Sequence, residues 1–411
     1  MSKDAVLPRL RFPGFKDKGA INLENGNVIF RPINNKNHNS DLPVLAISQE
    51  HGAIPREWID YNVSVSEKSL KNYKVVEVGD FIISLRSFEG GIEYSTRHGI
   101  CSPAYIILRK SCKIVEQYYK YYFKTDKYIQ DLNKDLEGIR DGKMVSYSQF
   151  SAILIPLPDN KEQQKIADCL SSLDDLITAE NEKLEALKTH KKGLMQKLFP
   201  TEGKTVPQLR FEGYTDAWEQ RKLGDVCIVG DIDHWMPKTV NNGIPYLMTG
   251  DFIGINELGF LKAKQISYDD YIKLSKRIKP EKGDLLFARY ASIGLVRYIT
   301  TERKFLVSYS CAIIKPIDVN GEFAFYQIQT KGMQQNIEIN INASSQRNIG
   351  IDSINKLDLL LPNKEEQATI SNFFRNLDRL IVAQTEKIEA LKLHKKGLMQ
   401  GLFPSAQEVM G

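Results

Sequence analysis

Residues 203–205, Gly-Lys-Thr, have the types that end a phosphate-binding loop, in which a lysine and backbone amides bind phosphate oxygens. Such a loop needs another glycine five residues before its final glycine, and this chain has Leu198 there. The loop must also follow a strand, whereas this stretch follows a predicted helix. We therefore interpret 203–205 as a linker. The sequence also has no GxGxxG motif in a βαβ context and no Asp/Asn/Ser-Pro-Pro-aromatic motif of the amino-methyltransferases.

Two carboxylates near the start of a predicted long helix, Asp159 and Glu162, could suggest nuclease chemistry together with Lys165. They are too close together in the chain for a nuclease centre, and acidic residues at a helix start stabilise the helix dipole. His190 and His394 each precede two lysines, and we interpret them as interface or solvated residues. The five cysteines form no CxxC or Cys/His cluster, which is typical of buried thiols in a reducing compartment. We therefore expect no catalytic residue and no metal site.

The composition is that of an ordinary soluble protein with more than one domain. The chain has 411 residues, of which 42% are hydrophobic and 26% are charged, and a chain of this size can bury the cores of about two to four domains. Its 56 Lys and Arg against 51 Asp and Glu make it only mildly basic, so local patches must bind any polyanion. No apolar run approaches the roughly 18 residues of a membrane span, and the N-terminus has no signal-peptide core. We expect a cytoplasmic protein with no membrane partner.

The strongest pattern in the sequence is an internal repeat. The segment 182–200 returns at 386–404, 204 residues later, with 16 of 19 positions identical. At the same offset, 157–164 matches 361–368. The roughly 150 residues before each copy share only scattered positions. This pattern indicates two different recognition modules held in one repeated frame.

The repeated segments predict two long helices with a heptad seam. The predicted seam positions are Ile166, Leu170, Leu173, Ile177, Leu184, Leu187, Leu194 and Leu198, and in the second copy Ile370, Phe374, Leu377, Ile381, Ile388, Leu391, Leu398 and Leu402. Glu180 and Lys191 interrupt the first seam, and Gln384 and Lys395 interrupt the second at the same places, which suggests that the register matters. At about 1.5 Å per residue each helix is about 57 Å long. The two helices can pair antiparallel within the chain; the alternative is a coiled coil between chains.

The segments before the helices predict mixed α/β modules. Both open with a similar phrase, at 7–15 and 206–214, and short strand-like runs follow. A Gly-Asp pair recurs at 79–80 and 283–284. We predict an α/β (α+β) fold with two mixed domains, separated by a pair of long antiparallel helices and related by a pseudo-twofold internal repeat. A common scaffold with different loops is typical of paired recognition domains.

At this point several motifs, each present twice and in the same order, resemble the specificity subunit of a type I restriction-modification system. They are the helix-start motif (Pro156, Pro158, Glu162 and Gln163; Pro362, Glu366 and Gln367), the Leu-Asp pairs at 173–174 and 377–378, and the KKGLMQxLFP endings. Leu360 replaces the first proline in the second copy, which affects only the last strand. The resemblance covers essentially the whole chain. It implies target recognition domains at 1–156 and 201–361, spacer helices at 157–200 and 362–404, and a tail at 405–411.

The resemblance also implies a function without catalysis. Such a subunit binds a bipartite site in double-stranded DNA and seats two adenine-N6 methyltransferase subunits and two restriction-translocation subunits. We expect no cofactor on this chain itself, with S-adenosylmethionine in the methyltransferase and ATP and magnesium in the restriction subunit. Two half-sites need two base-reading surfaces at a fixed rise and phase, which a rigid helix pair provides. Two alternatives stay open: a stand-alone sequence-specific DNA-binding protein, and a scaffold that joins two protein-binding modules.

Candidate DNA contacts are polar loop residues in each variable half. Arginine pairs with guanine through two hydrogen bonds, Asn and Gln pair with adenine, and Lys and Ser bind phosphate. The candidates are Arg86, Ser87, Arg140 and Lys143 in the first half and Arg289, Tyr290, Ser292, Gln346, Arg347 and Asn348 in the second. The aromatic run at 118–123 could suggest base stacking, but its helix-like setting favours packing.

Overall fold

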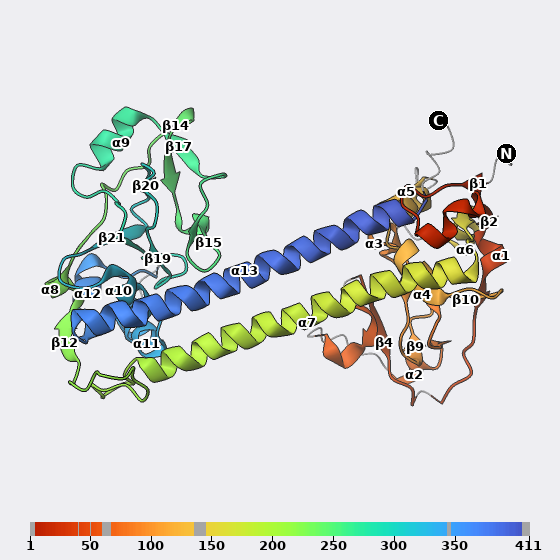
Figure 1. The fold of residues 1–411 in the computed structure, drawn as a ribbon, viewed down its shortest axis with the longest axis horizontal. Helices are drawn as coiled ribbons and strands as arrows, with labels where there is room; N and C mark the ends of the chain where they lie inside the picture. The colour runs from red at the N-terminus through yellow and green to blue at the C-terminus, as the bar shows by residue number, and fades with distance from the viewer. Residues whose placement is uncertain are drawn as a thin grey trace. The chain divides into compact units, whose positions relative to one another are not determined.

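The computed structural model describes residues 5–39, 41–49, 51–59, 67–134, 145–342 and 347–404, which form two compact units. Unit 1 comprises Met1–Glu180 and Ile388–Gly411, and unit 2 comprises Asn181–Lys387. The predicted fold class is confirmed, because each unit is a mixed α/β domain and two long helices connect them (Figure 1).

The two long helices, α7 (Asn160–Leu198) and α13 (Lys364–Leu402), each contain 39 residues. α7 begins in unit 1 and ends in unit 2, whereas α13 begins in unit 2 and ends in unit 1. Inside each unit, the start of one helix packs antiparallel beside the end of the other. The sequence-based boundaries gave each helix a segment of its own, but each helix is divided between the units. No helix in the described stretches is long and apolar enough to cross a bilayer.

Unit 1 is built on a four-stranded sheet with the order β3-β10-β7-β8 and a three-stranded sheet with the order β1-β2-β11. β10 pairs antiparallel with both β3 and β7, with Leu108 opposite Pro32 and Phe81. In chain order the elements are β1 (Ala5–Val6), η1 (Pro13–Lys18), β2 (Ile21–Asn25), α1 (Gly26–Ile29), β3 (Phe30–Ile33), β4 (Leu45–Ser48), β5 (Gly52–Pro55), η2 (Arg56–Trp58), α2 (Glu67–Leu70), β6 (Lys74–Val76), β7 (Phe81–Ile83), α3 (Ser87–Gly90), β8 (Glu93–Tyr94), β9 (Gly99–Cys101), β10 (Ile106–Lys110), α4 (Glu116–Tyr122), α5 (Asp126–Asn133), α6 (Tyr147–Ala152) and β11 (Leu154–Pro156).

Unit 2 has an equivalent four-stranded sheet, in the order β13-β21-β18-β19, and a separate three-stranded sheet, β17-β14-β20. β14 and β20 are parallel, with Tyr246 opposite Leu306. In chain order the elements are β12 (Glu219–Lys222), α8 (Leu223–Val226), β13 (Cys227–Gly230), β14 (Thr239–Leu247), η3 (Thr249–Asp251), β15 (Phe252–Ile253), β16 (Glu257–Leu258), β17 (Lys264–Ile266), α9 (Tyr268–Leu274), β18 (Leu285–Ala288), β19 (Val296–Tyr298), β20 (Leu306–Val307), β21 (Cys311–Pro316), α10 (Gly321–Ile328), α11 (Lys331–Ile339), α12 (Ile351–Asn355) and β22 (Asp358–Leu361).

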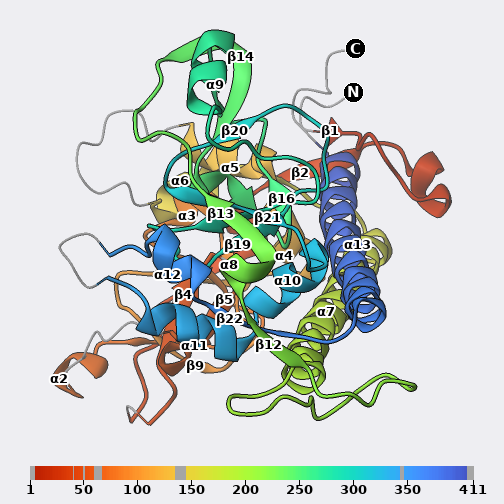
Figure 2. The ribbon, with the colours of Figure 1, turned by 90° about the vertical axis from the view of Figure 1, so that its left-hand side faces the viewer.

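The four-stranded sheet of each unit separates two hydrophobic cores, because side chains alternate between the faces of a strand. Phe81 of β7 and Phe287 of β18 point into a helix-side core, which also contains the ends of α7 and α13. Their neighbours in the same strands, Ile82 and Leu286, point to the opposite face and lie in an outer core. Figure 2 shows α10 beside α13, with β14 and α9 at the opposite end of unit 2.

The outer cores differ much more than the helix-side cores. Among the described residues, the outer core of unit 2 contains 16 buried hydrophobic residues and that of unit 1 contains six. Both helix-side cores are large and rich in aromatic residues. The aromatic run at 118–123, on α4 and its C-cap, packs in the helix-side core of unit 1, which confirms the predicted packing role. The two units therefore share the part next to the helices and diverge outside it.

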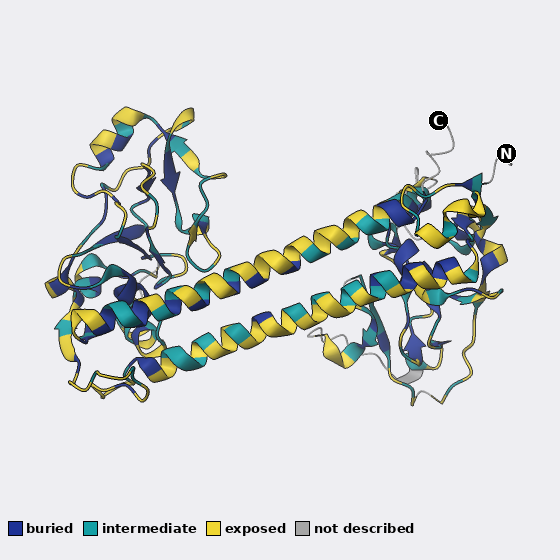
Figure 3. Ribbon diagram, in the orientation of Figure 1, coloured by how far each residue is buried: buried dark blue, intermediate teal, exposed yellow. Residues whose placement is uncertain are grey.

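The long helices bury the apolar face that the heptad pattern defines. Of the 16 predicted seam positions, ten are buried and six are half-buried. The other faces of both helices are mostly exposed, as Figure 3 shows. His190 and His394 are both exposed, away from the seam.

Candidate nucleic-acid interface

The opening phrase of each half, residues 7–15 and 206–214, binds the start of one long helix. Arg11 donates two hydrogen bonds to Glu162, with Nε–Oε1 and Nη2–Oε2 distances of 2.7 and 2.8 Å. Arg210 makes the same two bonds to Glu366, at 2.8 and 2.7 Å. Both carboxylates are buried, and their hydrogen bonds raise the pKa of each arginine. Glu162, one of the acids that could have suggested a nuclease, therefore stabilises the scaffold through its ion pair with Arg11.

The same phrase also holds the end of the other helix. The amide of Leu10 donates to the Gly401 carbonyl of α13 at 2.8 Å, and the amide of Leu209 donates to the Lys197 carbonyl of α7 at 2.9 Å. These carbonyls lie in the last turn of each helix, where backbone acceptors have no partner within the helix. Each phrase therefore ties together the start of one long helix and the end of the other, within one unit.

The glutamine of each helix-start motif connects the long helix to the α/β domain of the same unit. Gln163 Oε1 accepts the Val115 amide at 2.8 Å, and Gln367 Oε1 accepts the Asn320 amide at 2.8 Å. Their Nε2 atoms donate to the Pro158 and Pro362 carbonyls. Val115 and Asn320 are the N-caps of α4 and α10, so both glutamines orient equivalent helices.

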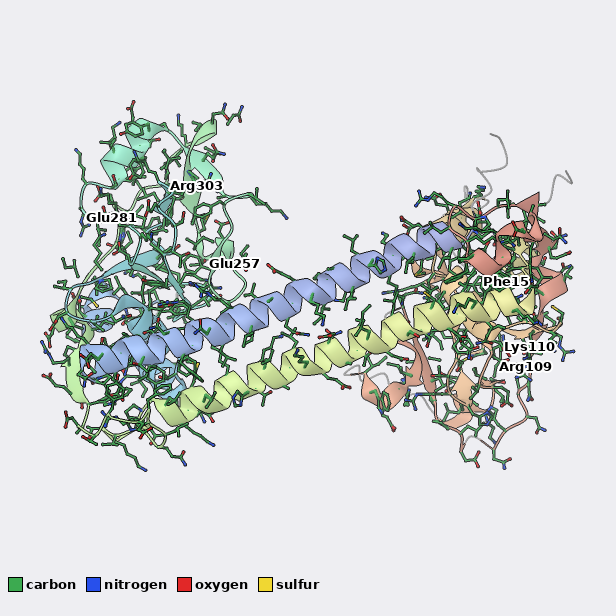
Figure 4. The ribbon with its side chains drawn as sticks, viewed as in Figure 1. Phe15, Arg109, Lys110, Glu257, Glu281 and Arg303 are labelled. Atoms are coloured by element: carbon green, nitrogen blue, oxygen red, sulfur yellow. The ribbon has the colours of Figure 1, made fainter. Side chains whose placement is uncertain are left out.

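The recurring Gly-Asp pairs are turns of the scaffold. Gly79 and Gly283 have φ values of 96° and 94°, a left-handed conformation that favours glycine. Asp80 pairs with Arg109 of β10 through two hydrogen bonds of 2.7 Å. Asp284 pairs with Lys315 of β21 at 2.6 Å, and Lys315 also binds Glu281 (Figure 4 labels Arg109 and Glu281). Each pair joins neighbouring strands of the four-stranded sheet.

Two predicted DNA-facing loops of unit 2 come together at one hollow. Tyr290, Ser292 and Arg347 line a hollow of about 350 Å³ that also contains Glu338. Ser292 has φ 59° and is the only non-glycine with a positive φ among the described residues. Ser292 lies in the turn after β18, and its side chain is exposed. These residues form the candidate interface of unit 2.

Arg289 has a different environment from the one expected of a base reader. Its guanidinium is buried, forms an ion pair with Asp231 and donates from Nε to the Ile349 carbonyl at 3.1 Å. The Ile349 amide in turn donates to the Arg289 carbonyl at 3.0 Å. His234 also binds Asp231, at 2.8 Å. Arg289 therefore connects its own loop to the loop at Ile349 from the buried side. We do not retain it as a DNA contact.

The remaining candidates are divided between exposed, buried and undescribed positions. Arg347 is exposed and pairs with Glu338, and Asn348 is half-buried in a bridge with Asn342. Arg86 is exposed at the start of α3. Ser87 is buried, and its Oγ accepts the Ser84 amide at 2.9 Å, so it stabilises the turn and is also not retained. Arg140, Lys143 and Gln346 lie outside the described residues and stay predictions.

Sequence reasoning missed cations that stack on aromatic rings at the surface. The Arg97 guanidinium lies 4.5 Å from the ring centroid of Trp58, a side chain that is 61% exposed. In unit 2, Arg303, labelled in Figure 4, lies 4.7 Å from the ring centroid of Phe260. Such pairs present a flat cationic surface, which suits contact with nucleic acid. A tryptophan directly after Arg56 and Glu57 was the signal of the Trp58 pair in the sequence.

Arg289→Ala should destabilise unit 2, whereas Arg347→Ala should leave its stability nearly unchanged. Loss of Arg289 leaves Asp231 buried without its arginine partner, and breaking a buried pair costs about 3 to 5 kcal/mol. The exposed Arg347–Glu338 pair contributes about 0 to 1 kcal/mol. Chemical denaturation of both variants measures the difference. Equal stability of the two variants would contradict the assigned roles.

The fold defines a chain with two divergent α/β domains on one duplicated frame, and comparisons with known proteins give its family. The family model for the type I restriction modification DNA specificity domain matches residues 16–189 and 215–393. The chain therefore belongs to the family of type I restriction-modification specificity subunits.

Relatives agree with this assignment, and solved structures agree with the fold. The MjaVIII specificity subunit of Methanocaldococcus jannaschii is 24% identical over 342 residues, covering 80% of this chain and 79% of that protein. The putative MjaX specificity subunit of the same organism is 25% identical over 369 residues, covering 84% and 82%. The type I S subunit from M. genitalium has a similar fold, with a TM-score of 0.54, 12% identity and coverage of 97% and 99%. A chain solved in work on the assembly and conformational transition of the type I R-M system gives a TM-score of 0.59, 16% identity and coverage of 93% and 97%.

Proposed function

We propose that this chain is the non-catalytic DNA-reading subunit of a type I complex and that it binds a bipartite, asymmetric site. The first recognition domain reads one half-site, the second reads the other, and the two long helices set the unspecified spacer between them. The observation that carries the proposal is the contrast, within each unit, between a repeated frame and a divergent outer part. The contacts Arg11–Glu162 and Arg210–Glu366 are repeated, whereas the outer cores and the loops above them differ.

The loops after β7 and β18 support the assignment of the reading surface. They occupy equivalent places in the two sheets, and each carries an exposed polar residue, Arg86 in unit 1 and Ser292 in unit 2. Arg347 adds a guanidinium that could pair with a guanine once it leaves Glu338. Surface loops on a rigid scaffold can change their reading residues without altering the fold.

The proposed partners are two adenine-N6 methyltransferase subunits and, in the full complex, two restriction-translocation subunits. Support comes from repeated residues that packing does not require. Lys188 and Lys392, and likewise His190 and His394, are exposed in both copies of the repeat. Identical exposed residues at two places suit two copies of one partner. In this proposal S-adenosylmethionine binds to the methyltransferase, and ATP and magnesium bind to the restriction subunit.

Sequencing of modified adenines in cells with and without this chain tests the proposal. We expect one bipartite motif, two short defined half-sites around a fixed undefined spacer, to be methylated only when the chain is present. A stand-alone DNA-binding protein would leave the methylation unchanged and bind its site tightly without a methyltransferase. A protein scaffold would show no salt-dependent affinity for DNA at all. Either result would contradict the proposal.

A further inference from the structure

The lysine that interrupts the seam of α7 is held by an aspartate of α13 and a tyrosine of the recognition domain. In unit 2, Lys191 Nζ lies 2.5 Å from Asp378 Oδ1, and both side chains are nearly buried, at 12% and 13% exposed. The Tyr326 hydroxyl of α10 donates to the other oxygen, Oδ2, at 2.9 Å. The lysine also lies over the Tyr326 ring, 5.4 Å from its centroid. One carboxylate therefore joins three helices.

The same arrangement occurs in unit 1 with the helices exchanged. Lys395 of α13 forms an ion pair with Asp174 of α7. The Tyr121 hydroxyl of α4 donates to Asp174 Oδ2 at 2.8 Å, and Lys395 lies 5.0 Å from the Tyr121 ring centroid. Burial raises the pKa of Tyr121 and of Tyr326, so each phenol keeps the proton that it donates. We call each Lys–Asp–Tyr group a polar lock.

The two polar locks specify one register of the helix pair. Asp174 and Lys191 are 17 residues apart on α7 (174 to 191), and Asp378 and Lys395 are 17 residues apart on α13 (378 to 395). In an antiparallel pair, equal separations mean that both ion pairs form at the same relative position of the two helices. The polar locks in the two units are therefore mutually consistent.

The apolar seam by itself does not select this register, because its pattern repeats every seven residues. A slide of α13 by seven residues would place Ser371 or Thr385 opposite Lys191. It would place Ala167 or Asn181 opposite Lys395. None of these residues is acidic, so both lysines would lose their partners in a largely apolar seam. Leucine at these two positions would be compatible with the slid register as well as with the observed one.

We propose that Lys191 and Lys395 are specificity-determining positioning residues, which fix the register of the helix pair and thereby the single spacer length of the DNA site. This inference rests on the proposed function. A polar group in an apolar seam can lower stability and still be kept, because it excludes other registers. The opening phrases hold each helix end in its unit, and the polar locks fix how the helices meet there.

The test is the double variant Lys191→Leu with Lys395→Leu, expressed as the full chain with its methyltransferase. We expect a lower Tm, because Asp378 and Asp174 lose their lysine partners, and a chain that still folds, because leucine extends the apolar seam. We also expect the same half-sites but several spacer lengths, with methylation at other spacings increased about tenfold or more. Lys161→Leu with Lys364→Leu is the matched control, since these lysines are exposed at the starts of the same helices and neither is repeated in the other copy. The control should keep one spacer.

Charge exchange gives a second, independent arm. Lys191→Asp with Asp378→Lys, combined with Lys395→Asp and Asp174→Lys, should restore a single spacer, because each ion pair forms again in the reversed sense. One unchanged spacer in the leucine variant, or equal broadening in the control, would overturn the inference. General loss of methylation at every spacing would also overturn it, since that result indicates a purely structural role. A wild-type chain with no bipartite motif would instead contradict the proposed function.

Discussion

The purified chain should neither methylate nor cut DNA by itself, and adenine methylation should appear only when a methyltransferase subunit is added. The sequence has no S-adenosylmethionine-binding or amino-methyltransferase motif. The repeated charged pairs, Arg11–Glu162 and Arg210–Glu366, hold the scaffold together. Enzymes accelerate their reactions by about 10⁶-fold or more, so the expected difference is all or none. Transfer of a labelled methyl group from S-adenosylmethionine to duplex DNA measures it.

The controls for this experiment are the methyltransferase alone and the complex on DNA without the motif. Neither should give specific methylation. Titration by native mass spectrometry should end at two methyltransferase subunits per chain, because the exposed repeat residues occur twice. Purified chain that methylates or cleaves DNA unaided would contradict the account. A methyltransferase that modifies the same motif alone would contradict it too, since the sequence would then be read by the partner.

The frame could be predicted from the sequence because its signals are periodic and duplicated. The seam positions follow a heptad pattern that depends only on spacing along one helix, and ten of them are buried. The opening phrases and the helix-start motifs could be matched between the halves. Their contact could not be predicted, because Arg11 and Glu162 are 151 residues apart in the chain. The division of each helix between two units could not be predicted for the same reason, since it depends on long-range packing.

The reading surface was predicted less well, because residue type and loop position do not determine burial. Arg289 follows a strand, as an exposed base reader could, but Asp231, 58 residues earlier, pairs with its guanidinium in the interior. Ser87 is buried by its own turn. Tyr290, Ser292 and Arg347 were predicted in two separate loops, and the structure brings them to one hollow. Local patterns identified the loops, and tertiary contacts decided which side chains face outward.

Lengthening both long helices by one heptad should lengthen the DNA spacer and leave both half-sites unchanged. We would insert seven residues after Thr178 of α7 and seven after Val382 of α13, which are equivalent positions between the lock residues of each helix. Seven residues keep the heptad seam and rotate the helix face by only about 20°. They add about 10 Å, close to three base pairs at about 3.4 Å each.

Insertion in α7 alone is the matched control. It separates Asp174 from Lys191 by 24 residues (17 plus the seven inserted), while Asp378 and Lys395 stay 17 apart. The two polar locks then require different registers and cannot both form. We expect this variant to be less stable and to methylate poorly, in contrast to the paired insertion. Equal behaviour of the single and paired insertions would argue against the helix pair as the spacer.

Sequencing of methylated adenines in cells that carry the paired insertion tests the central claim most directly, because one experiment reports both half-sites and their separation. The account predicts the two wild-type half-sites, unchanged in every base, with a spacer longer by about three base pairs. An unchanged spacer with full methylation would contradict it, and so would altered bases in either half-site.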